Sequence, residues 1–521
     1  MRQLYFLLCG ILCFSATAQD GTLDATFGNN GIAIFDNPNG DARAFDLLLN
    51  GNALTTAGFH TDDNQKIGDA LRLSRDGEQD IASFGLNGYA DHASLGAGSE
   101  LHAIAPAGDG SYYLAGWRQA GSASNHLLVK MTADGMAATD FGTNGGVESN
   151  YCGGFGRDQI NSIAIQSDGR IILAGYNYCG TDESGVLLCY NPDGSPCADF
   201  ANEGGRLVEI YETYRFDPLF GMVVDDNDNI YVAGNIQQSG GPDPDSMYIM
   251  KIDPLGATDA SFGTNGYVVI GTPNATDFRV GALTLDNQNR LLVGGQAYNT
   301  SNISSDWIVA RVSTVDGSLD PSFGTAGIWL DAGNNNLGGI RDIVVQPSDD
   351  IIVVGTYNYG ASIVRLSDGG SLENEFGTNG RATVVSTYSF NGFNAVVADG
   401  DRLYLGGYIY NNQRYQTMLA KVVNTGITST RAPVQRLPLR VHPNPTTDAL
   451  ALAFEVPVAT QLSLELRHPD GRVVHRQAAR SVAAGTYTWA LPRPAGLAAG
   501  TYFVSLRGAS LAGTQRVVWL P

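Results

Sequence analysis

The chain has 521 residues, 43 % of them hydrophobic, and a formal net charge of −21. Its length allows either several domains or one large repeat body. The charge is uneven, because residues 439–521 carry +4 and residues 1–18 carry +1, so that residues 19–438 carry −26. A body this acidic repels nucleic acid and anionic membrane surfaces, so we expect neither as a partner.

Residues 1–18 have the pattern of a secretory signal peptide. Arg2 supplies the basic start, Leu4–Phe14 is an apolar run, and Ala16-Thr17-Ala18 is a small-residue cleavage site. The alternative, a membrane anchor, is disfavoured because the apolar run is far shorter than the ~20 residues that span a bilayer. We predict cleavage between Ala18 and Gln19, export through the periplasm, and no transmembrane span in the mature chain.

Four cysteines remain after the leader: Cys152, Cys179, Cys189 and Cys197. An even number of cysteines in an exported protein predicts two disulfides. Cys189 and Cys197 flank an Asn-Pro-Asp-Gly turn at residues 191–194, which places them across a hairpin and leaves Cys152 to pair with Cys179. A four-thiolate zinc site is the alternative, although the chain has no C-x-x-C pair.

A segment typified by Gly21–Gly31 recurs along the chain at steps of 53 to 62 residues. Repetition at this period indicates an array of one supersecondary unit, because a single unit could not bury its own apolar face. We interpret the recurring Phe as packing between units and the Gly four residues later as a turn position that needs positive φ. The pairs are Phe27/Gly31, Phe84/Gly88, Phe141/Gly145, Phe200/Gly204, Phe262/Gly266, Phe323/Gly327 and Phe376/Gly380.

Each repeat contains the signals of four short strands. Ile163–Gly175 shows two apolar runs around an Asp-Gly turn, which predicts a hairpin, and Leu127–Gly135 shows the strand that follows. The strand after the Phe-Gly segment, Gly31–Asp36 in the first copy, is the fourth. Seven such repeats predict an all-β fold, a seven-bladed β-propeller of four-stranded blades over residues 19–426. A β-solenoid is the alternative, but its coils are usually shorter.

The first Phe-Gly strand precedes any complete hairpin, and the last repeat ends after its third strand. Ile32–Phe35 is therefore predicted to fill the outer place in the blade that contains Ala395–Val423. Such a clasp ties the two ends of the repeat region together and removes an unpaired sheet edge.

These residues resemble the delta-60 repeat family, whose pattern is Leu-Asp-x-x-Phe-Gly-x-x-Gly followed by a hairpin that ends in Ala-Gly or Gly-Gly. Gly317–Gly327 matches this pattern well. The fourth copy departs from it, with Cys197 in place of Asp and Ala201 in place of Gly, so we expect an irregular blade that the extra cysteines compensate. The resemblance implies a propeller and no particular activity.

A different region follows the connector at residues 427–438. Residues 439–521 show short alternating strands separated by turns, which predicts a small Ig-like β-sandwich. Its order of motifs is similar to the type A C-terminal sorting domain of the type IX secretion system of Bacteroidota. The matching residues are Pro443, Asn444, Pro445, Gly471, Gly500 and Tyr502.

This resemblance implies passage across the outer membrane and recognition by the type IX secretion machinery. It also implies removal of the domain near the connector and, in many relatives, attachment to surface lipopolysaccharide. The protein is therefore expected to be secreted or attached to the outer-membrane surface. The alternative is an ordinary Ig-like module used for binding.

Common hydrolase and nucleotide-binding signatures are absent from the sequence. His60, His92, His102 and His126 lie in the first two repeats, and a His-based catalytic pair is an alternative to structural roles for them. Asp225–Asn229 resembles the start of a calcium loop, but it equally fits the polar turn of a repeat hairpin. We expect no cofactor, with calcium as the alternative.

Ligand binding is expected on the face formed by the loops that vary between repeats. Aromatic residues gather there beside polar groups, and flat rings next to hydrogen-bonding side chains suit sugars. We predict a binding protein for a glycan or an extracellular protein, with a glycan-cleaving lyase or hydrolase as the alternative. Packing of these rings between blades is the structural alternative. The predicted ligand-binding residues are Trp117, Tyr176, Tyr178, Tyr298, Tyr357, Tyr408 and Tyr410.

Overall fold

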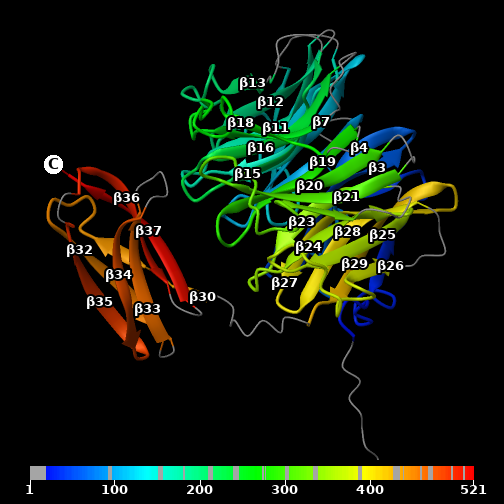
Figure 1. Ribbon diagram of the computed structural model, residues 1–521. Helices are drawn as coiled ribbons and strands as arrows, with labels where there is room; N and C mark the ends of the chain where they lie inside the picture. Colours follow the sequence, from blue (N-terminus) through cyan, green and yellow to red (C-terminus); the bar gives the residue numbers. More distant parts are fainter. Residues whose placement is uncertain are drawn as a thin grey trace, which may run out of the picture.

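The computed structural model describes residues 19–91, 97–150, 156–179, 182–208, 210, 215–238, 246–272, 275, 277–299, 304–331, 338–384, 390–425, 435–437, 439–457, 460–467, 473–494, 497–507 and 511–520. The predicted leader up to Ala18 lies outside the described residues, as do His92, Cys152 and Gly471. Within these ranges the regular elements are all β-strands (Figure 1). No helix in them is long and apolar enough to cross a membrane.

The repeat region folds into antiparallel units of four strands, the architecture of a β-propeller. Short β14 (Arg215–Phe216) pairs with two neighbouring units and joins them into one nine-stranded sheet. From inner to outer strand, the first three units in chain order are β2 (Ala42–Asn50), β3 (Ala53–Asp62), β4 (Gln65–Ser74), β5 (Tyr89–Asp91); then β6 (Ser99–Pro106), β7 (Tyr112–Ala120), β8 (Ala123–Met131), β9 (Gly146–Ser149); then β10 (Gln159–Ile165), β11 (Ile171–Cys179), β12 (Asp182–Tyr190), β13 (Gly205–Val208). The next two are β15 (Leu219–Val224), β16 (Ile230–Gln238), β17 (Ser246–Ile252), β18 (Tyr267–Ile270); then β19 (Asp277–Leu285), β20 (Arg290–Asn299), β21 (Ser304–Ser313), β22 (Ile328–Asp331). The last two are β23 (Ile340–Val345), β24 (Ile351–Tyr357), β25 (Gly360–Leu366), β26 (Arg381–Val384); then β27 (Asn391–Asp399), β28 (Arg402–Asn411), β29 (Arg414–Val423), β1 (Ile32–Phe35).

The units close into a ring. The inner strand of each unit contacts the inner strand of the next, from β2 through β6, β10, β15, β19 and β23 to β27, which contacts β2 again. The predicted clasp is confirmed, because β1 pairs antiparallel with β29, with Ile32 opposite Ala420 and Phe35 opposite Thr417. The start and the end of the repeat region therefore share one sheet. In that sheet β1 covers the edge of β29, which would otherwise be unpaired.

The Phe-Gly segments join each unit to the next. All of the recurring Phe side chains are buried, with at most 1 % of their surface exposed, and the glycines that follow have φ between 81° and 99°. Both interpretations made from the sequence are confirmed. In the fourth copy Phe200 is fully buried, and Ala201 takes a φ of 46° where other copies have glycine. The segment therefore keeps its conformation despite the substitution, although positive φ is unfavourable for alanine.

The C-terminal region forms two sheets around a core of its own. The core includes Leu452, Leu464 and Trp519, and all of its members lie between residues 437 and 519. One sheet has the order β30 (Gln435–Arg436), β37 (Leu511–Trp519), β36 (Gly500–Arg507), β33 (Thr460–Arg467), β34 (Val473–Val482), and the other has the order β31 (Arg440–His442), β32 (Ala449–Val456), β35 (Gly485–Pro492).

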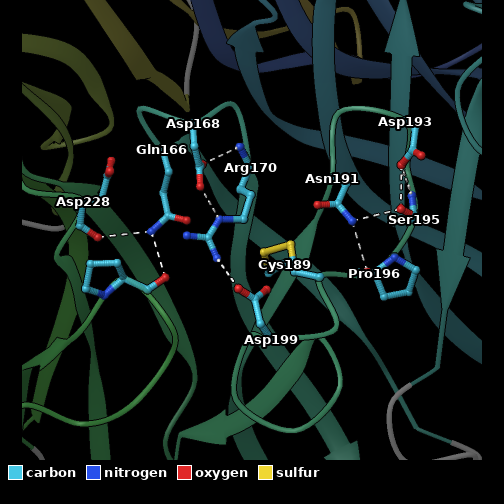
Figure 2. The surroundings of a disulfide bond; sticks show 12 residues. Gln166, Asp168, Arg170, Cys189, Asn191, Asp193, Ser195, Pro196, Asp199 and Asp228 are labelled. Atoms are coloured by element: carbon cyan, nitrogen blue, oxygen red, sulfur yellow. Dashed lines mark hydrogen bonds and ion pairs between the residues drawn. A yellow bond between two sulfur atoms is a disulfide. The ribbon is translucent and has the colours of Figure 1, made fainter.

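The predicted disulfide between Cys189 and Cys197 is confirmed, with a Cα–Cα distance of 5.4 Å. Figure 2 shows it beside Arg170, whose guanidinium lies 3.7 Å from the Asp199 carboxylate. The second predicted disulfide, Cys152–Cys179, stays a prediction, since Cys152 and the side chain of Cys179 lie outside the described residues.

The disulfide occupies the place of an ion pair. In several other units the third strand carries a Lys or Arg and the Phe-Gly segment carries the Asp, as in Arg311 and Asp320, whose Nε and Oδ2 are 2.9 Å apart. The backbone register is the same, because Cys197 N donates to Cys189 O at 3.0 Å and Asp320 N donates to Arg311 O at 2.9 Å. The equivalent ion pairs elsewhere are Arg72–Asp80, Lys251–Asp259 and Lys421–Asp24.

We predict that the disulfide can be exchanged for the ion pair of the other units. The double variant Cys189→Ser/Cys197→Ser should lose about 2 kcal/mol in free energy of unfolding, because the cross-link no longer restricts the unfolded chain. The double variant Cys189→Lys/Cys197→Asp should recover part of that loss and should no longer show the reductant sensitivity that the Cys189–Cys197 disulfide causes. Denaturant titration with and without dithiothreitol measures both effects. Equal stability of the Ser and Lys/Asp variants would contradict the equivalence.

Candidate ligand-binding face

The variable loops lie at one end of the sheets. Because neighbouring strands run in opposite directions, the turns between second and third strands and the links to the next unit share one end. The Asp-Gly turns and the Phe-Gly segments share the other end. We call the first end the variable face, since it contains the loops in which the predicted ligand-binding residues lie.

Aromatic side chains recur at one register position near this face. They directly follow the glycine of the second strand, and their neighbours on the inner strand are polar residues or glycine. Phe59 is buried, whereas Trp117, Tyr176 and Tyr408 are half-buried. The cross-strand pairs are Phe59 with Arg43, Trp117 with Glu100, Tyr176 with Gln159, and Tyr408 with Gly392.

Next to Trp117, the Glu100 carboxylate contacts the side chains of Lys66 and His102. It forms an ion pair with Lys66, and its Oε2 lies 2.9 Å from His102 Nε2. The His102 ring stacks on Phe45 at 4.2 Å with an angle of 8° between the planes. Burial acts to raise the pKa of Glu100, but the hydrogen bonds from His102 and Lys66 outweigh it and hold this pKa below its usual value. Glu100 is therefore an ionised carboxylate near the variable face.

Tyr176 is a hydrogen-bond donor. Its hydroxyl donates to Gln159 Oε1 at 3.0 Å. Burial, helped by the negative charge of Glu183, raises the pKa of Tyr176 to about 12, so the phenol stays protonated at neutral pH. Its carbonyl oxygen lies 3.0 Å from His126 Nε2, and His126 is the cross-strand neighbour of Trp117. His126 thus connects two predicted ligand-binding residues that lie on neighbouring units.

Each described histidine of the repeat region lies near a carboxylate, which the sequence did not show. His60 Nδ1 is 2.7 Å from Asp69 Oδ2, and His126 Nδ1 is 4.0 Å from Asp158 Oδ2. Burial lowers the pKa of His126 to about 4 and raises the pKa of Asp158 to about 6. Because both side chains are almost fully buried, this pair cannot meet a substrate. His102 is the more accessible of the histidines that lie beside the predicted aromatic residues.

The other predicted ligand-binding residues lie in different surroundings. Tyr357 packs under the Arg381 guanidinium at 3.7 Å and meets the edge of Trp307 at 6.1 Å, which is the structural role considered as the alternative. Tyr178 is paired across strands with Glu183. Tyr298 lies on a different unit from Tyr178 and is paired across strands with Asp277 of its own unit. The face therefore does not gather all seven residues at one place.

Tyr408 and Tyr410 belong to a larger group, which we call the aromatic cluster. Tyr415 contacts both of them, at 5.4 and 4.9 Å between ring centroids. Phe390 lies 6.3 Å from Tyr410 and 4.9 Å from Tyr359. Phe390 and Tyr415 were not predicted, although the two-residue turn between Asn411 and Arg414 implies that Tyr415 faces Tyr410. Phe390 and Tyr359 expose 48 % and 44 % of their surface.

The candidate calcium loop forms the turn between β15 and β16, as the hairpin interpretation predicts. Asp225 Oδ1 accepts hydrogen bonds from the backbone of Asn227 and Asn229, and its Oδ2 accepts one from the Asn229 side chain. Nowhere in the described ranges do three or more His, Cys, Asp or Glu side chains come together to hold a metal ion. A cavity of 410 Å³ lies among the Phe-Gly segments, lined by Ala201, Asn202, Arg206, Leu207 and Gly256, away from the predicted ligand-binding residues.

These features define a β-propeller repeat protein with an aromatic and polar face. A family model described as "Domain of unknown function (DUF5122) beta-propeller" matches residues 166–200 and 289–323. No curated protein matches the chain. Similar solved structures include the polysaccharide lyase Uly1, with 11 % identity, a TM-score of 0.41, and coverage of 79 % of this chain and 98 % of that one.

Two further structures show the same level of likeness. The PQQ-bound aldose sugar dehydrogenase from Streptomyces coelicolor has 14 % identity and a TM-score of 0.33, covering 62 % of this chain and 93 % of that one. Trypanosoma rangeli sialidase in complex with sialic acid has 10 % identity and a TM-score of 0.34, covering 97 % and 92 %. Likenesses this remote carry no information about activity.

Two inner-strand carboxyls have strongly raised pKa values. Asp46 Oδ2 accepts a hydrogen bond from Ile104 N at 2.9 Å, and Asp342 Oδ2 accepts one from Val396 N at 2.8 Å, so each ties its strand to the next inner strand. Burial raises the pKa of Asp46 to about 6. Burial, with the nearby charge of Asp46 adding to it, raises the pKa of Asp342 to about 7.

These shifts predict a ring that loses stability as the pH rises. An unfolded Asp has a pKa near 4, so the folded state binds more protons between about pH 4 and pH 7. Its extra stability is complete below pH 4 and is lost as the pH rises through 6 and 7. Asp342→Asn should flatten this dependence, whereas the exposed turn variant Asp63→Asn should not. Melting temperatures measured from pH 5 to pH 8 test this, and an unchanged slope in Asp342→Asn would contradict it.

Proposed function

We propose that the protein is a secreted or surface-attached glycan-binding propeller. In this proposal residues 19–426 form seven four-stranded blades, residues 427–438 are a linker, and residues 439–521 are an Ig-like sorting domain. The domain delivers the ring through the type IX secretion machinery. An extracellular protein is the second class of ligand that the face would suit.

The observation that carries the binding proposal is the recurrence of aromatic residues at one register position beside polar inner-strand residues. Trp117 lies beside the Glu100 carboxylate, and the Tyr176 hydroxyl is already oriented by Gln159. Sugar rings stack on aromatic faces, and their hydroxyls need fixed donors and acceptors. A ring of paired strands holds such groups in place with little loss of entropy on binding.

A glycan-cleaving enzyme is the second candidate, and Glu100 and His102 favour it. A carboxylate that orients an imidazole through a hydrogen bond is an arrangement suited to general acid–base chemistry. His102 retains 15 % of its side-chain surface, so it is not sealed from the solvent. Assays for new reducing ends or unsaturated products on the bound sugars distinguish this candidate from simple binding.

The sorting proposal is supported by the C-terminal region's separate core and by its motif residues. Asn444 Nδ2 donates to Arg516 O, and its Oδ1 accepts from Val518 N, each at 2.8 Å, so the Pro-Asn-Pro segment is fixed against β37. The Tyr502 hydroxyl donates to Ala498 O at 3.0 Å. These motif residues shape the fold of the region, which is what recognition of the whole domain by a secretion machine would require.

We predict that Trp117→Ala and Tyr176→Ala weaken glycan binding about tenfold or more, because each removes a ring from the proposed site. A glycan array of the mature protein identifies the ligands, and calorimetry measures the variants. Melting temperatures should stay nearly unchanged, since both rings are half-buried. Tyr176→Phe, which removes only the hydroxyl, separates the contribution of the hydroxyl from that of the ring. A large loss of stability in both alanine variants would make these residues part of the core instead.

We predict that deletion of Leu439–Pro521 leaves a folded ring that accumulates in the periplasm of the native host. The ring closes through β1 and β29 without any strand from the C-terminal region, so its folding should not need that region. Cell fractionation with an antibody to the ring measures the location. Normal export of the truncated protein would show that the region is not a sorting domain.

A further inference from the structure

Arg43 lies on the inner strand β2 and has no anionic partner among the described residues. Its guanidinium lies 3.6 Å from the ring centroid of Tyr415 and 5.3 Å from that of Tyr408. Its Nε is buried and has no hydrogen-bond partner in the described part of the chain. The chain has 52 acidic residues. Arg43 therefore differs from the arginines of the ring that form ion pairs with Asp, such as Arg381 and Arg414.

Arg381 shows how the same stacking looks when the charge is satisfied. Its guanidinium lies 3.7 Å from the ring centroid of Tyr357, almost the same distance as Arg43 from Tyr415. Unlike Arg43, it also forms an ion pair with Asp331. Arg414, the neighbour of Tyr415 along the chain, is likewise paired, with Asp36 at 2.7 Å. An arginine that stacks on an aromatic ring in this fold can therefore still form an ion pair with a carboxylate.

A guanidinium that is partly withdrawn from water gains most from a planar oxyanion. Its fork of N–H groups matches the geometry of a carboxylate or a sulfate, and such charge-assisted hydrogen bonds are about twice as strong as neutral ones. In this chain the protein supplies stacking to Arg43 but no oxyanion. An oxyanion of a bound ligand would therefore suit Arg43 as the partner that the protein does not supply.

The aromatic cluster leads outward from Arg43. Tyr415 contacts Tyr410, Tyr410 contacts Phe390, and Phe390 contacts Tyr359. Tyr359 and Phe390, the two exposed rings, have φ values of 66° and 62°. Bulky residues seldom adopt positive φ, because the conformation costs free energy. The fold thus keeps two large rings at the surface on an unfavourable backbone, and Tyr410 and Tyr415 connect them to the ring on which Arg43 stacks.

We propose that Arg43 and the aromatic cluster form a subsite for an acidic sugar residue, one that carries a carboxylate or a sulfate. The oxyanion of this residue binds the Arg43 guanidinium beside Tyr415, and a neighbouring sugar of the same glycan stacks on Tyr359 and Phe390. This proposal rests on the glycan-binding function and names the class of glycan. The ring around this site is strongly acidic and repels a densely charged polyanion. The site therefore favours a glycan whose acidic group lies opposite Arg43.

The test uses a glycan array with matched triplets of oligosaccharides: a uronate, its methyl ester, and the corresponding sulfated neutral sugar. The mature full-length chain should bind the uronate or the sulfated form at least tenfold more tightly than the ester. Arg43→Gln should abolish that preference while leaving weak binding of the ester. Arg43→Lys, which keeps the charge but not the fork, should retain only part of the preference. Arg279→Gln, which changes an exposed arginine at the same register position of another unit, is the matched control.

The double variant Tyr359→Ala/Phe390→Ala should weaken binding of charged and ester forms alike, because it removes the stacking surface. Equal binding of charged and ester forms by the wild-type protein, or a preference that survives Arg43→Gln, overturns this proposal. In either case binding that depends on Trp117 and Tyr176 leaves the glycan-binding function intact. A wild-type protein that binds no glycan overturns both. The melting temperature of each variant separates lost binding from lost folding.

Discussion

The ring depends on one backbone hydrogen bond that is repeated from unit to unit. The amide after each recurring Phe donates to a carbonyl in the turn of the next unit, as Gly28 N does to Asp76 O and Gly85 N to Asp134 O, both at 2.8 Å. The Phe itself is buried under that turn, so burial of a large apolar ring and satisfaction of a backbone donor occur together. The last bond of the series runs from Gly377 N to Asp20 O, at 3.0 Å. Ring closure therefore uses residues directly after the predicted cleavage site.

The side chains next to this bond vary more than the bond itself. Most units place a Lys or Arg of the third strand beside the carboxylate of the Phe-Gly segment, whereas one unit uses the Cys189–Cys197 disulfide. A further unit has Lys130 with Ala138 at the carboxylate position, and its lysine binds Asp109 instead. The backbone register is the same in all of these units. The fold therefore requires this register and tolerates different side-chain pairs at the position. A buried ion pair is a weak source of net stability, which explains why this exchange is tolerated.

The parts of the fold that the sequence predicted are those that one repeat specifies alone. The buried Phe, the positive-φ glycines, the clasp of Ile32–Phe35 and the Cys189–Cys197 pair all follow from local patterns or from the order of the strands. The contacts that the predicted ligand-binding residues make follow from neither. Every inner strand carries a β-bulge, as between Ala44 and Asp46, and no repeated residue type marks it. Likewise, the meeting of Arg43 with Tyr415 joins the first and last hairpins of the ring, which are far apart along the chain.

Closure and the proposed recognition lie at opposite ends of the strands. The inter-unit bonds, the buried Phe rings and the ion pairs or disulfide gather where the Phe-Gly segments lie, and they fix how neighbouring units meet. The other end is then free to differ between units: a Glu100–His102 pair in one, a Tyr176–Gln159 pair in the next, and the aromatic cluster at the seam of the first and last hairpins. Side chains at this end can change without disturbing closure, because the paired strands hold their backbone in either case. A single scaffold can therefore present unlike groups of side chains around one ring.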